Sequence, residues 1–228
     1  MGRRELEHFM IGDSYGGNQD WFKSFMMRIG GCGAETACDS SLYFALHKGL
    51  DRLYPFAPDE LTQTDYVEFS CIMEKYLWPR MSGINKIETF AEGYSKYLDD
   101  IGESRLTMDT FDGTEPVQNA AKVLREQIDN GFPVPALTLN HRNKSFKDFN
   151  WHWYLINGYD DTDEVITDDE KSGGIERDIA KAGDEYSEEF GGLKVKAVTY
   201  SGWTWVDFRK LWETGHVRRG GLILFRLA

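Results

Sequence analysis

Apolar residues recur every three or four positions along the first part of the chain, and this spacing predicts amphipathic helices. The strongest case is residues 33–50, where small and apolar side chains form one stripe and Gly49 ends the pattern. The same spacing predicts helices in three further ranges, residues 59–79, 84–102 and 115–131. The first half of the chain is therefore expected to be helical.

Beyond Gly131 the pattern changes to short runs of β-branched and aromatic residues, which are typical of strands. Strands are predicted at residues 133–139, 151–159, 164–167, 193–200 and 221–227, with one short helix at 206–215 before the last of them. A helical part followed by a mostly antiparallel sheet is an α+β arrangement. We therefore expect a helical N-terminal lobe and an antiparallel β C-terminal lobe with a cleft between them.

Residues 168–192 break this pattern. The segment holds nine acidic and three basic residues, so it carries about half of the chain's formal net charge of -12. Glycines lie near both of its ends, and it stands between two predicted strands. It is predicted to be an acidic insertion, either a solvated helix or a mobile flap.

The composition indicates a folded chain with an acidic surface. Of the 228 residues 41% are hydrophobic, which is enough to bury a sizeable core. The net charge of -12 disfavours nucleic acid and anionic lipid as partners, because both are negatively charged. No apolar run reaches the ~18 residues of a transmembrane helix, and the N-terminal segment lacks the apolar stretch of a secretory signal. The sequence thus predicts a cytoplasmic location, with no membrane partner.

Of the three cysteines, Cys32 has the setting of a nucleophile. Three is an odd number, and the spacing fits neither a zinc cluster nor a disulfide framework. Cys38 and Cys71 lie inside helical patterns and are interpreted as core residues. Cys32 stands in the segment GGCGA at the start of a predicted helix, where backbone N–H groups stabilise a thiolate and can bind an oxyanion. A lone cysteine at such a place can equally be a small buried residue beside a tight turn.

A second element, His152, favours the chemical interpretation. It lies in the segment NWHWYLINGYD, a predicted strand of bulky residues that ends in a turn. A histidine on a rigid strand, across a cleft from a cysteine at a helix start, has the placement that an imidazole base needs. The alternative for His152 is a core histidine with satisfied hydrogen bonds. The other histidines lie in less suitable segments: His8, His47, His141 and His216.

Together the two segments resemble a known family. GGCGAETACDSSLYF, followed far downstream by HWYLINGYD, is similar to papain-like peptidases of the bacteriocin-processing, double-glycine type. Those show a Cys-Gly pair at a helix start and then a His-aromatic strand that ends in Gly-Tyr-Asp. The resemblance covers about residues 18–168. It implies a papain-like cysteine-peptidase fold, in which residues 1–228 form a single catalytic domain. The helical lobe would span about 18–131 and the β lobe about 132–228, with the acidic insertion 168–192.

The resemblance also implies a residue that orients the histidine from the next strand. Asp168 follows the predicted strand 164–167 and matches the family's aspartate in position, although Asp169 stands where a proline is common. A tight turn would place Asp168 opposite Leu155 rather than His152, so a bulge or twist is required. If the orienting residue follows the insertion instead, Ser201 is the next choice.

The family's oxyanion donor is a glutamine ahead of the cysteine. The only upstream glutamine is Gln19, in the segment GGNQDW, and the intervening loop is longer than usual in the family. A side-chain amide beside glycines and aromatic residues suits the wall of a cleft. The alternative is that Gln19 and its neighbour Asn18 cap a short helix.

The resulting hypothesis is a thiol hydrolase that acts on a peptide or amide substrate. The Cys32 thiolate attacks the carbonyl, Gln19 and the Cys32 N–H bind the oxyanion, and His152, oriented by Asp168, moves the protons. No metal or organic cofactor is implied. Two alternatives remain: a papain-like binding module that has lost catalysis, and a thiol acyltransferase with the same Cys-His pair.

Overall fold

The computed structural model describes residues 2–80, 83–162, 172–173, 192–213 and 216–228. Its α-helices are α1 (Phe25–Gly30), α2 (Cys32–Lys48), α3 (Gln63–Met73), α4 (Ile87–Asp100), α5 (Val117–Asp129) and α8 (Phe208–Glu213). Short 3-10 turns occur at Gln19–Trp21, Asp51–Leu53 and Lys144–Phe149. No helix among these residues is long and apolar enough to cross a membrane.

The helices predicted from the sequence are confirmed, with shifted ends. α2 begins at Cys32 and ends where Gly49 takes a φ of 63°, the left-handed conformation that glycine adopts at little cost. α3 is shorter than residues 59–79, because the Thr62 side chain caps it at its first turn and the helix ends at Met73. The segment ahead of Cys32, expected to be a loop, contains α1.

Eight of the described strands form one large antiparallel sheet. Its order is β4-β12-β5-β7-β9-β10-β8, and β1 also pairs with β7. The bounds are β1 (Arg3–Glu5), β4 (Leu106–Asp112), β5 (Val134–Thr138), β7 (His152–Asp160), β8 (Ser172–Gly173), β9 (Lys194–Thr199), β10 (Gly202–Asp207) and β12 (Gly221–Leu227). Two small ribbons pair β2 (Met10–Ile11) with β3 (Ser14–Tyr15) and β6 (Asn140–His141) with β11 (His216–Arg218).

This sheet confirms the α+β class but not the division of the chain at about residue 131. β1 and β4 come from the part of the sequence assigned to the helical lobe, yet both join the sheet. β4 lies at one end of the strand order and exposes half of its side chains, so its sequence lacks the apolar run that identified the other strands. The predicted strand 164–167 lies outside the described residues. Most of the acidic segment 168–192 likewise lies outside the described residues, and its two described residues, Ser172 and Gly173, form β8, which pairs with β10.

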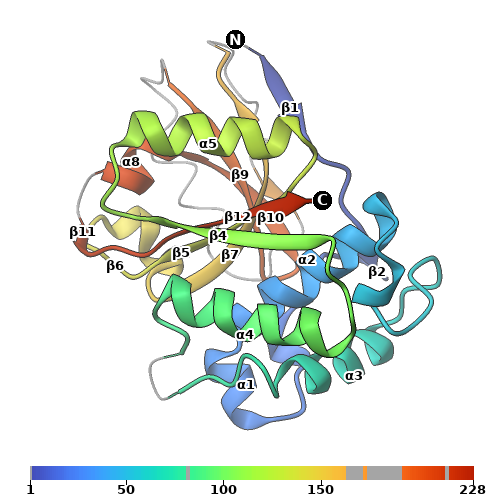
Figure 1. Ribbon diagram of the computed structural model, residues 1–228. Helices are drawn as coiled ribbons and strands as arrows, with labels where there is room; N and C mark the ends of the chain where they lie inside the picture. Colours follow the sequence, from blue (N-terminus) through green and yellow to red (C-terminus); the bar gives the residue numbers. More distant parts are fainter. Residues whose placement is uncertain (1, 81–82, 163–171, 174–191, 214–215) are drawn as a thin grey trace.

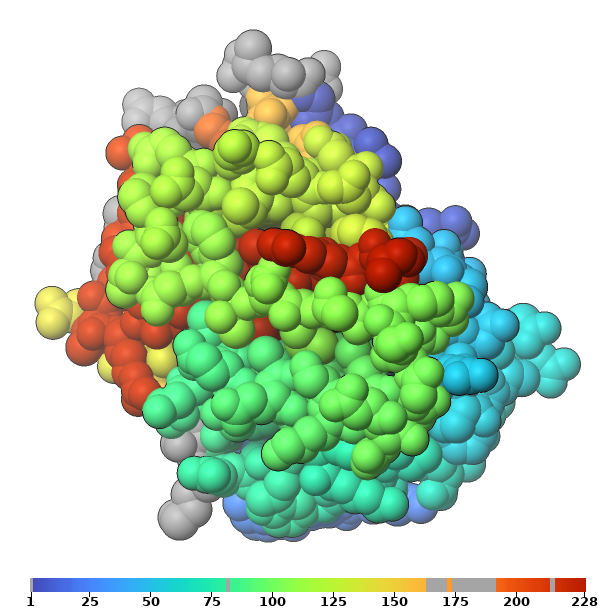
Figure 2. All heavy atoms as spheres, in the orientation of Figure 1, coloured from blue at the N-terminus to red at the C-terminus, as the bar shows by residue number. Residues whose placement is uncertain are grey.

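Helices lie on both sides of the sheet (Figure 1). α5 lies above β4 and β12 in that view, and α1, α3 and α4 lie below β4. Figure 2 shows the C-terminal strand β12 at the surface, between α5 and β4. α2 packs its first turns against β7, so the start of this helix and the start of β7 meet inside the protein.

α2 is buried on nearly all sides, including its polar residues. Glu35, Thr36, Asp39, Ser40 and Ser41 are each at most 4% exposed, and Ala37 and Cys38 between them are fully buried. A helix buried all round must satisfy its polar side chains inside the protein. The Ser40 hydroxyl donates to the Thr36 carbonyl at 2.7 Å, and Ser41 shares a 2.8 Å bond with the Tyr94 hydroxyl. The two carboxyl groups need partners from other segments, which are described below.

Gly17 is expected to be one of the least replaceable glycines. A Cβ atom at this position would lie 1.8 Å from the Tyr66 hydroxyl oxygen, which is held 2.6 Å from an Asp39 carboxyl oxygen in the core. Gly17→Ala should therefore lower the free energy of unfolding by about 3 kcal/mol, measured by urea denaturation. Gly192→Ala is the control, because a Cβ there meets nothing within 4 Å. Equal losses in the two variants would contradict this packing.

Candidate active site

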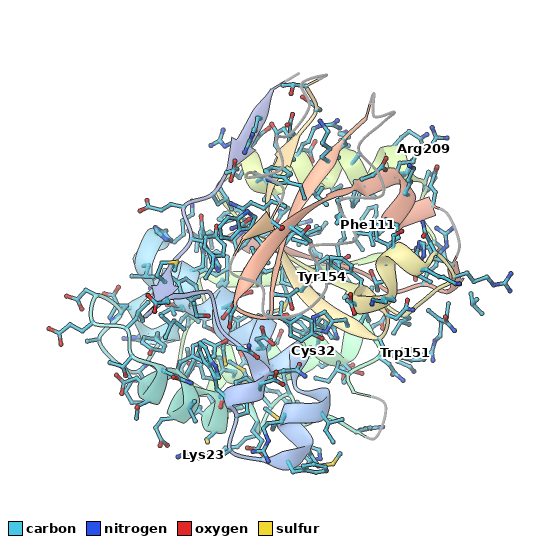
Figure 3. The ribbon with its side chains drawn as sticks, turned by 180° about the vertical axis from the view of Figure 1, so that it is seen from behind. Lys23, Cys32, Phe111, Trp151, Tyr154 and Arg209 are labelled. Carbon is cyan, nitrogen blue, oxygen red and sulfur yellow. The ribbon has the colours of Figure 1, made fainter. Side chains whose placement is uncertain are left out.

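Cys32 occupies the first position of α2, as predicted, and its sulfur faces the start of β7. The backbone N–H groups of Trp153, Gly33 and Cys32 lie near enough to the sulfur to lower the pKa of the thiol. Trp153 is the residue after His152 at the start of β7. Seen from behind, Cys32 lies where the helices meet the strands (Figure 3). The fold thus brings together the two segments that the sequence singled out.

Burial dominates the acidity of this thiol. Cys32 is 5% exposed, and burial raises the pKa of its thiol from 9.0 to about 12. The Trp153, Gly33 and Cys32 N–H groups lower this pKa, whereas the nearby Glu35 carboxyl raises it. The expected stabilisation by the helix start is present, but it is smaller than the cost of placing a charge in a buried site. At rest, Cys32 is therefore a thiol at neutral pH.

His152 is buried at the first position of β7 and is held by the segment that follows β9. Its Nε2 lies 2.6 Å from Oγ1 of Thr199. Its ring stacks on the Tyr200 ring with centroids 4.6 Å apart and planes 8° apart. The Tyr200 hydroxyl is 3.2 Å from Nδ1, but with nearly parallel rings it lies over the imidazole rather than in its plane. This contact therefore does not use the in-plane lone pair through which Nδ1 accepts a proton.

The tryptophans on either side of His152 have different settings. Trp153 is a core residue, because its ring stacks on Phe90 of α4 and its indole N–H donates to the Ile84 carbonyl at 2.7 Å. Trp151 is 44% exposed, with the Arg218 guanidinium 5.5 Å above its ring. Of the two, only Trp151 is at the surface.

Thr199 occupies the place expected for the orienting residue. Asp168, the sequence prediction, lies outside the described residues. Extending the pairing of Leu155 with Val198 along the two strands would place Ser201 opposite His152. The chain turns before that point, and the Ser201 hydroxyl accepts a 3.0 Å bond from the Asn18 side chain instead. Sequence reasoning missed Thr199, although the strand that ends in it was predicted.

Gln19 is buried close to α1, but its side chain is partly committed. Its Nε2 donates to the Arg28 carbonyl at 2.9 Å, which ties the 3-10 turn to α1. Its Oε1 is buried, without a hydrogen-bond partner among the described residues. One N–H of the amide is therefore used structurally, and the other is the donor available for an oxyanion. Asn18 caps this turn through the Asp20 N–H, as the alternative interpretation expected.

Two carboxyl groups on α2 lie beneath this site, one helical turn apart. Glu35 Oε2 accepts the Gln19 N–H at 3.1 Å, and the Tyr200 N–H lies near enough to the carboxyl to lower its pKa. Asp39 accepts the Gly17 N–H at 3.2 Å and the Tyr66 hydroxyl at 2.6 Å. Burial raises the pKa of Glu35 well above its usual range, and the Asp39 carboxyl raises it further. Burial likewise raises the pKa of Asp39, from 3.8 to about 7.

Two other histidines, His141 and His216, lie apart from this site. Cys38 is fully buried and Cys71 half-buried, and all three cysteines are free thiols. His141 and His216 stack on each other near α8, with centroids 4.7 Å apart. Among the described residues, no group of three or more His, Cys, Asp or Glu side chains is placed to hold a metal ion.

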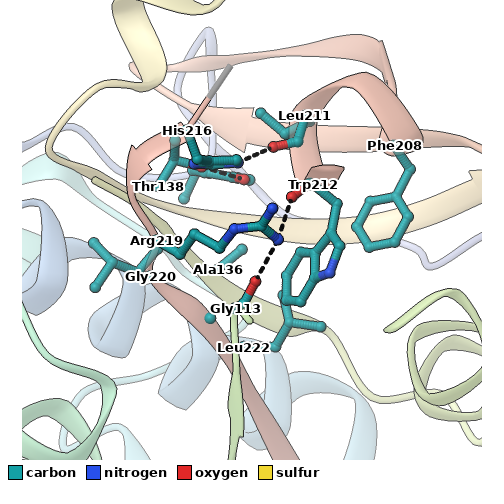
Figure 4. Close-up of a pocket in the computed structure, with 13 residues that line it drawn as sticks. Gly113, Ala136, Thr138, Phe208, Leu211, Trp212, His216, Arg219, Gly220 and Leu222 are labelled. Carbon is teal, nitrogen blue, oxygen red and sulfur yellow. Dashed lines mark hydrogen bonds between the residues drawn. The ribbon is translucent and has the colours of Figure 1, made fainter. Parts of the chain in front are cut away.

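A small pocket lies near β5 and α8, where Thr138 and Tyr154 form part of its lining (Figure 4). Its internal volume of about 10 Å³ has room for no more than about one water molecule. The Arg219 guanidinium there donates to the carbonyls of Gly113, at 3.0 Å, and Trp212, at 3.2 Å. Those bonds join two chain segments, so the arginine is structural. This pocket is too small for a substrate.

Comparisons of the chain with protein-family models, with curated proteins and with solved structures found no match. The candidate site is therefore judged on its own geometry.

The raised pKa of Asp39 predicts how stability depends on pH. Because the folded pKa is about 7 and the ordinary value is 3.8, the carboxyl stabilises the fold below about pH 4 and loses this contribution as the pH rises through 7. Asp39→Asn removes this titration. The free energy of unfolding of the wild type relative to Asp39→Asn should fall by about 4 kcal/mol between pH 4 and pH 7. A difference that is constant or rises with pH in urea denaturation would contradict the assignment.

Proposed function

We propose that the protein is a papain-like thiol hydrolase that cleaves an amide or peptide bond through an acyl-enzyme on Cys32. The observation that carries the proposal is the packing of the start of α2 on the start of β7, where a Cβ on Gly33, the residue after Cys32, would lie 3.4 Å from the ring of Trp153, the residue after His152. A nucleophile at a helix start and a base on the adjoining strand are the two parts that this chemistry needs. The antiparallel sheet packed on α2 is consistent with a papain-like fold.

In the proposed mechanism His152 takes the thiol proton of Cys32 at Nδ1 as the sulfur attacks the substrate carbonyl. The Cys32 N–H and the second N–H of Gln19 bind the oxyanion. The C–N bond then breaks and the amine leaves with the proton from His152. Water, deprotonated by His152, attacks the thioester, which releases the acid and restores the thiol.

Thr199 takes the orienting role in this proposal. For Nδ1 to act as base, Nε2 must carry the hydrogen and donate it to Thr199 Oγ1, the atom 2.6 Å away. A hydroxyl is a weaker partner than a carboxylate for the imidazolium that forms, because it carries no charge. Asp168 remains a proposed alternative for this role.

The raised pKa of Cys32 favours a second candidate, a papain-like binding module. When the pKa of the Cys32 thiol rises from 9.0 to about 12, the fraction of thiolate at neutral pH falls about a thousandfold. A hydrolase with this thiol depends on transfer of the proton to His152 during the reaction, whereas a binding module has no such need. The two candidates therefore differ in whether the reactivity of Cys32 depends on His152.

Alkylation by iodoacetamide at pH 7, followed by mass spectrometry, distinguishes them. Judged by burial alone, half-buried Cys71 should react before Cys32 and Cys38. The hydrolase proposal expects the reverse, with Cys32 at least about tenfold faster than Cys71, because His152 removes its proton. His152→Ala should then slow Cys32 to below the rate of Cys71.

His141→Ala is the matched control, since His141 is also buried but lies on β6 and contacts the Lys210 carbonyl. It should leave the rate at Cys32 unchanged. Two results together would contradict the hydrolase proposal and favour the binding module. Cys32 would react more slowly than Cys71 in the wild type, and the rate at Cys32 would be the same in His152→Ala as in His141→Ala.

Thr199→Val tests the orienting hydroxyl. The variant keeps the side-chain shape but removes Oγ1, so the rate at Cys32 should fall about tenfold, the equivalent of one lost hydrogen bond. Thr199→Ser should keep most of the rate. The control is Thr204→Val, because Thr204 is also fully buried and its hydroxyl has no hydrogen-bond partner among the described residues. If Cys32 reacts at the wild-type rate in Thr199→Val, a residue other than Thr199 orients His152.

A further inference from the structure

The chain around the β6–β11 ribbon concentrates positive charge on an acidic protein. Residues 141–150 and 207–219 hold seven basic and three acidic residues, whereas the whole chain has a formal net charge of -12. The two ranges meet because β6 pairs with β11, and both strands lie on one flank of the molecule (Figure 1). Figure 3 shows Trp151 and Arg209 on this flank. The flank is therefore basic, although the protein as a whole is acidic.

Three of these bases are exposed and unpaired. Arg142, Lys144 and Lys147 lie in or beside the 3-10 turn Lys144–Phe149, and within the part of the chain that the structure describes none of the three forms an ion pair. The one acidic residue of this segment, Asp148, is half-buried. Exposed charges of one sign on a fixed surface attract a ligand of the opposite sign.

Trp151 follows this turn and has a strained backbone. Its φ is 56°, a conformation that is an outlier for a bulky residue, and its side chain is 44% exposed. The Trp151 N–H donates to the Leu139 carbonyl at 2.7 Å, which helps to hold the backbone in place. Strain of this kind is concentrated at functional sites, such as those that bind ligands. Here it presents an aromatic ring at the surface instead of packing it in the core.

Arg218 indicates which ligand charge suits the surroundings of this ring. Its guanidinium lies 5.5 Å from the centroid of the Trp151 ring. Arginine that stacks on an aromatic ring keeps in-plane N–H groups that can bind a carboxylate through two parallel bonds. Arg218 is exposed and forms no ion pair with any described residue. The pair therefore offers an apolar surface and a carboxylate donor side by side.

We propose that Arg142, Lys144, Lys147, Trp151 and Arg218 form a docking surface for an acidic peptide segment that carries an apolar side chain. The carboxylates of the peptide pair with the bases, and its apolar side chain contacts the Trp151 ring. A nucleic acid fits less well, because it extends beyond this surface onto the acidic remainder of the protein. That the bound peptide is a substrate rests on the proposed hydrolase function, whereas the docking itself does not.

Fluorescence anisotropy with a labelled peptide tests the proposal. The probe is a fluorescein-labelled oligoglutamate with a central phenylalanine, and the protein is the full chain with Cys32→Ala, which cannot cleave the probe. We expect binding in the micromolar range at about 0.1 M salt, and weaker binding as the salt concentration rises. The same probe with glutamine in place of each glutamate should bind at least about tenfold more weakly.

The double variant Lys144→Glu and Lys147→Glu should weaken binding of the acidic probe about 10- to 100-fold, because each change replaces an attraction by a repulsion. The matched control is the double variant Lys75→Glu and Lys96→Glu. Both of those lysines are exposed, form no ion pair among the described residues and lie on or beside other helices, α3 and α4. The control changes the net charge equally and should leave the affinity within about twofold.

Trp151→Gly tests the ring. Glycine accepts the positive φ at this position, so the variant keeps the fold while it removes the aromatic surface. The affinity for the acidic probe should fall about tenfold. Trp151→Phe keeps an aromatic ring and should retain most of the affinity.

Equal affinity for the glutamate and glutamine probes would overturn the proposal, as would equal losses in the two double variants. Wild-type affinity in a folded Trp151→Gly protein would also overturn it. So would tighter binding of a fluorescein-labelled oligouridylate than of the acidic probe, since this surface would then be a nucleic-acid interface. Cleavage plays no part in these measurements, so failure of the hydrolase proposal and failure of the docking surface are separate results.

Discussion

The structure depends on how the polar side of a buried helix is satisfied. α2 passes through the interior with two carboxyl groups on its surface, and a buried carboxyl without hydrogen-bond donors is costly. The donors come from main-chain N–H groups of Gly17 and Gln19, and from the Tyr66 hydroxyl. Segments far apart in the sequence are thereby attached to one helix. The same attachment places the Cys32 end of that helix against β7.

Glycine makes this attachment sterically possible. Gly16 has a φ of 80°, and an added Cβ there would lie 2.9 Å from both an Asp39 carboxyl oxygen and the His8 ring. At Gly17 the Tyr66 hydroxyl fills the space of a side chain. The main chain therefore passes close enough for its N–H to reach Asp39. In the sequence Gly16 and Gly17 stand out only as neighbours of Gln19, but the structure requires them because the Asp39 carboxyl lies against this part of the main chain.

The sequence was sufficient for those parts of the fold that follow from local periodicity. The helices around residues 33–50, 84–102 and 115–131 and the strands that contain His152 and Thr199 are all present, because their apolar patterns are strong. β4 was missed because half of its side chains are exposed, and β1 because it is three residues long and exposed. Both strands gain their place from long-range pairing, which local patterns do not record.

For the site, the sequence was sufficient for Cys32 at a helix start and His152 on a strand, and the fold brings their segments together. Thr199 and Glu35 were not identified, for different physical reasons. The contact of Thr199 with His152 depends on where the hairpin turns, and the turn residues Tyr200 and Ser201 carry no turn signal. Glu35 was overlooked because a glutamate in the first turn of a helix is ordinarily a solvated residue that favours the helix dipole.

Glu35 also links the two properties of the site that oppose each other. Ionised, it adds negative charge near the sulfur and raises the pKa of Cys32, against the effect of the N–H groups at the helix start. Burial raises the pKa of Glu35 well above its ordinary value, so its neutral form persists to higher pH than in an exposed glutamate, and a neutral carboxyl still accepts hydrogen bonds through its carbonyl oxygen. In that form it holds the Gln19 N–H without opposing a thiolate. Burial lowers the acidity of the Cys32 thiol directly. By favouring the neutral form of Glu35, it also removes a charge that would lower this acidity further. In the proposed mechanism His152 then takes the proton that Cys32 must lose.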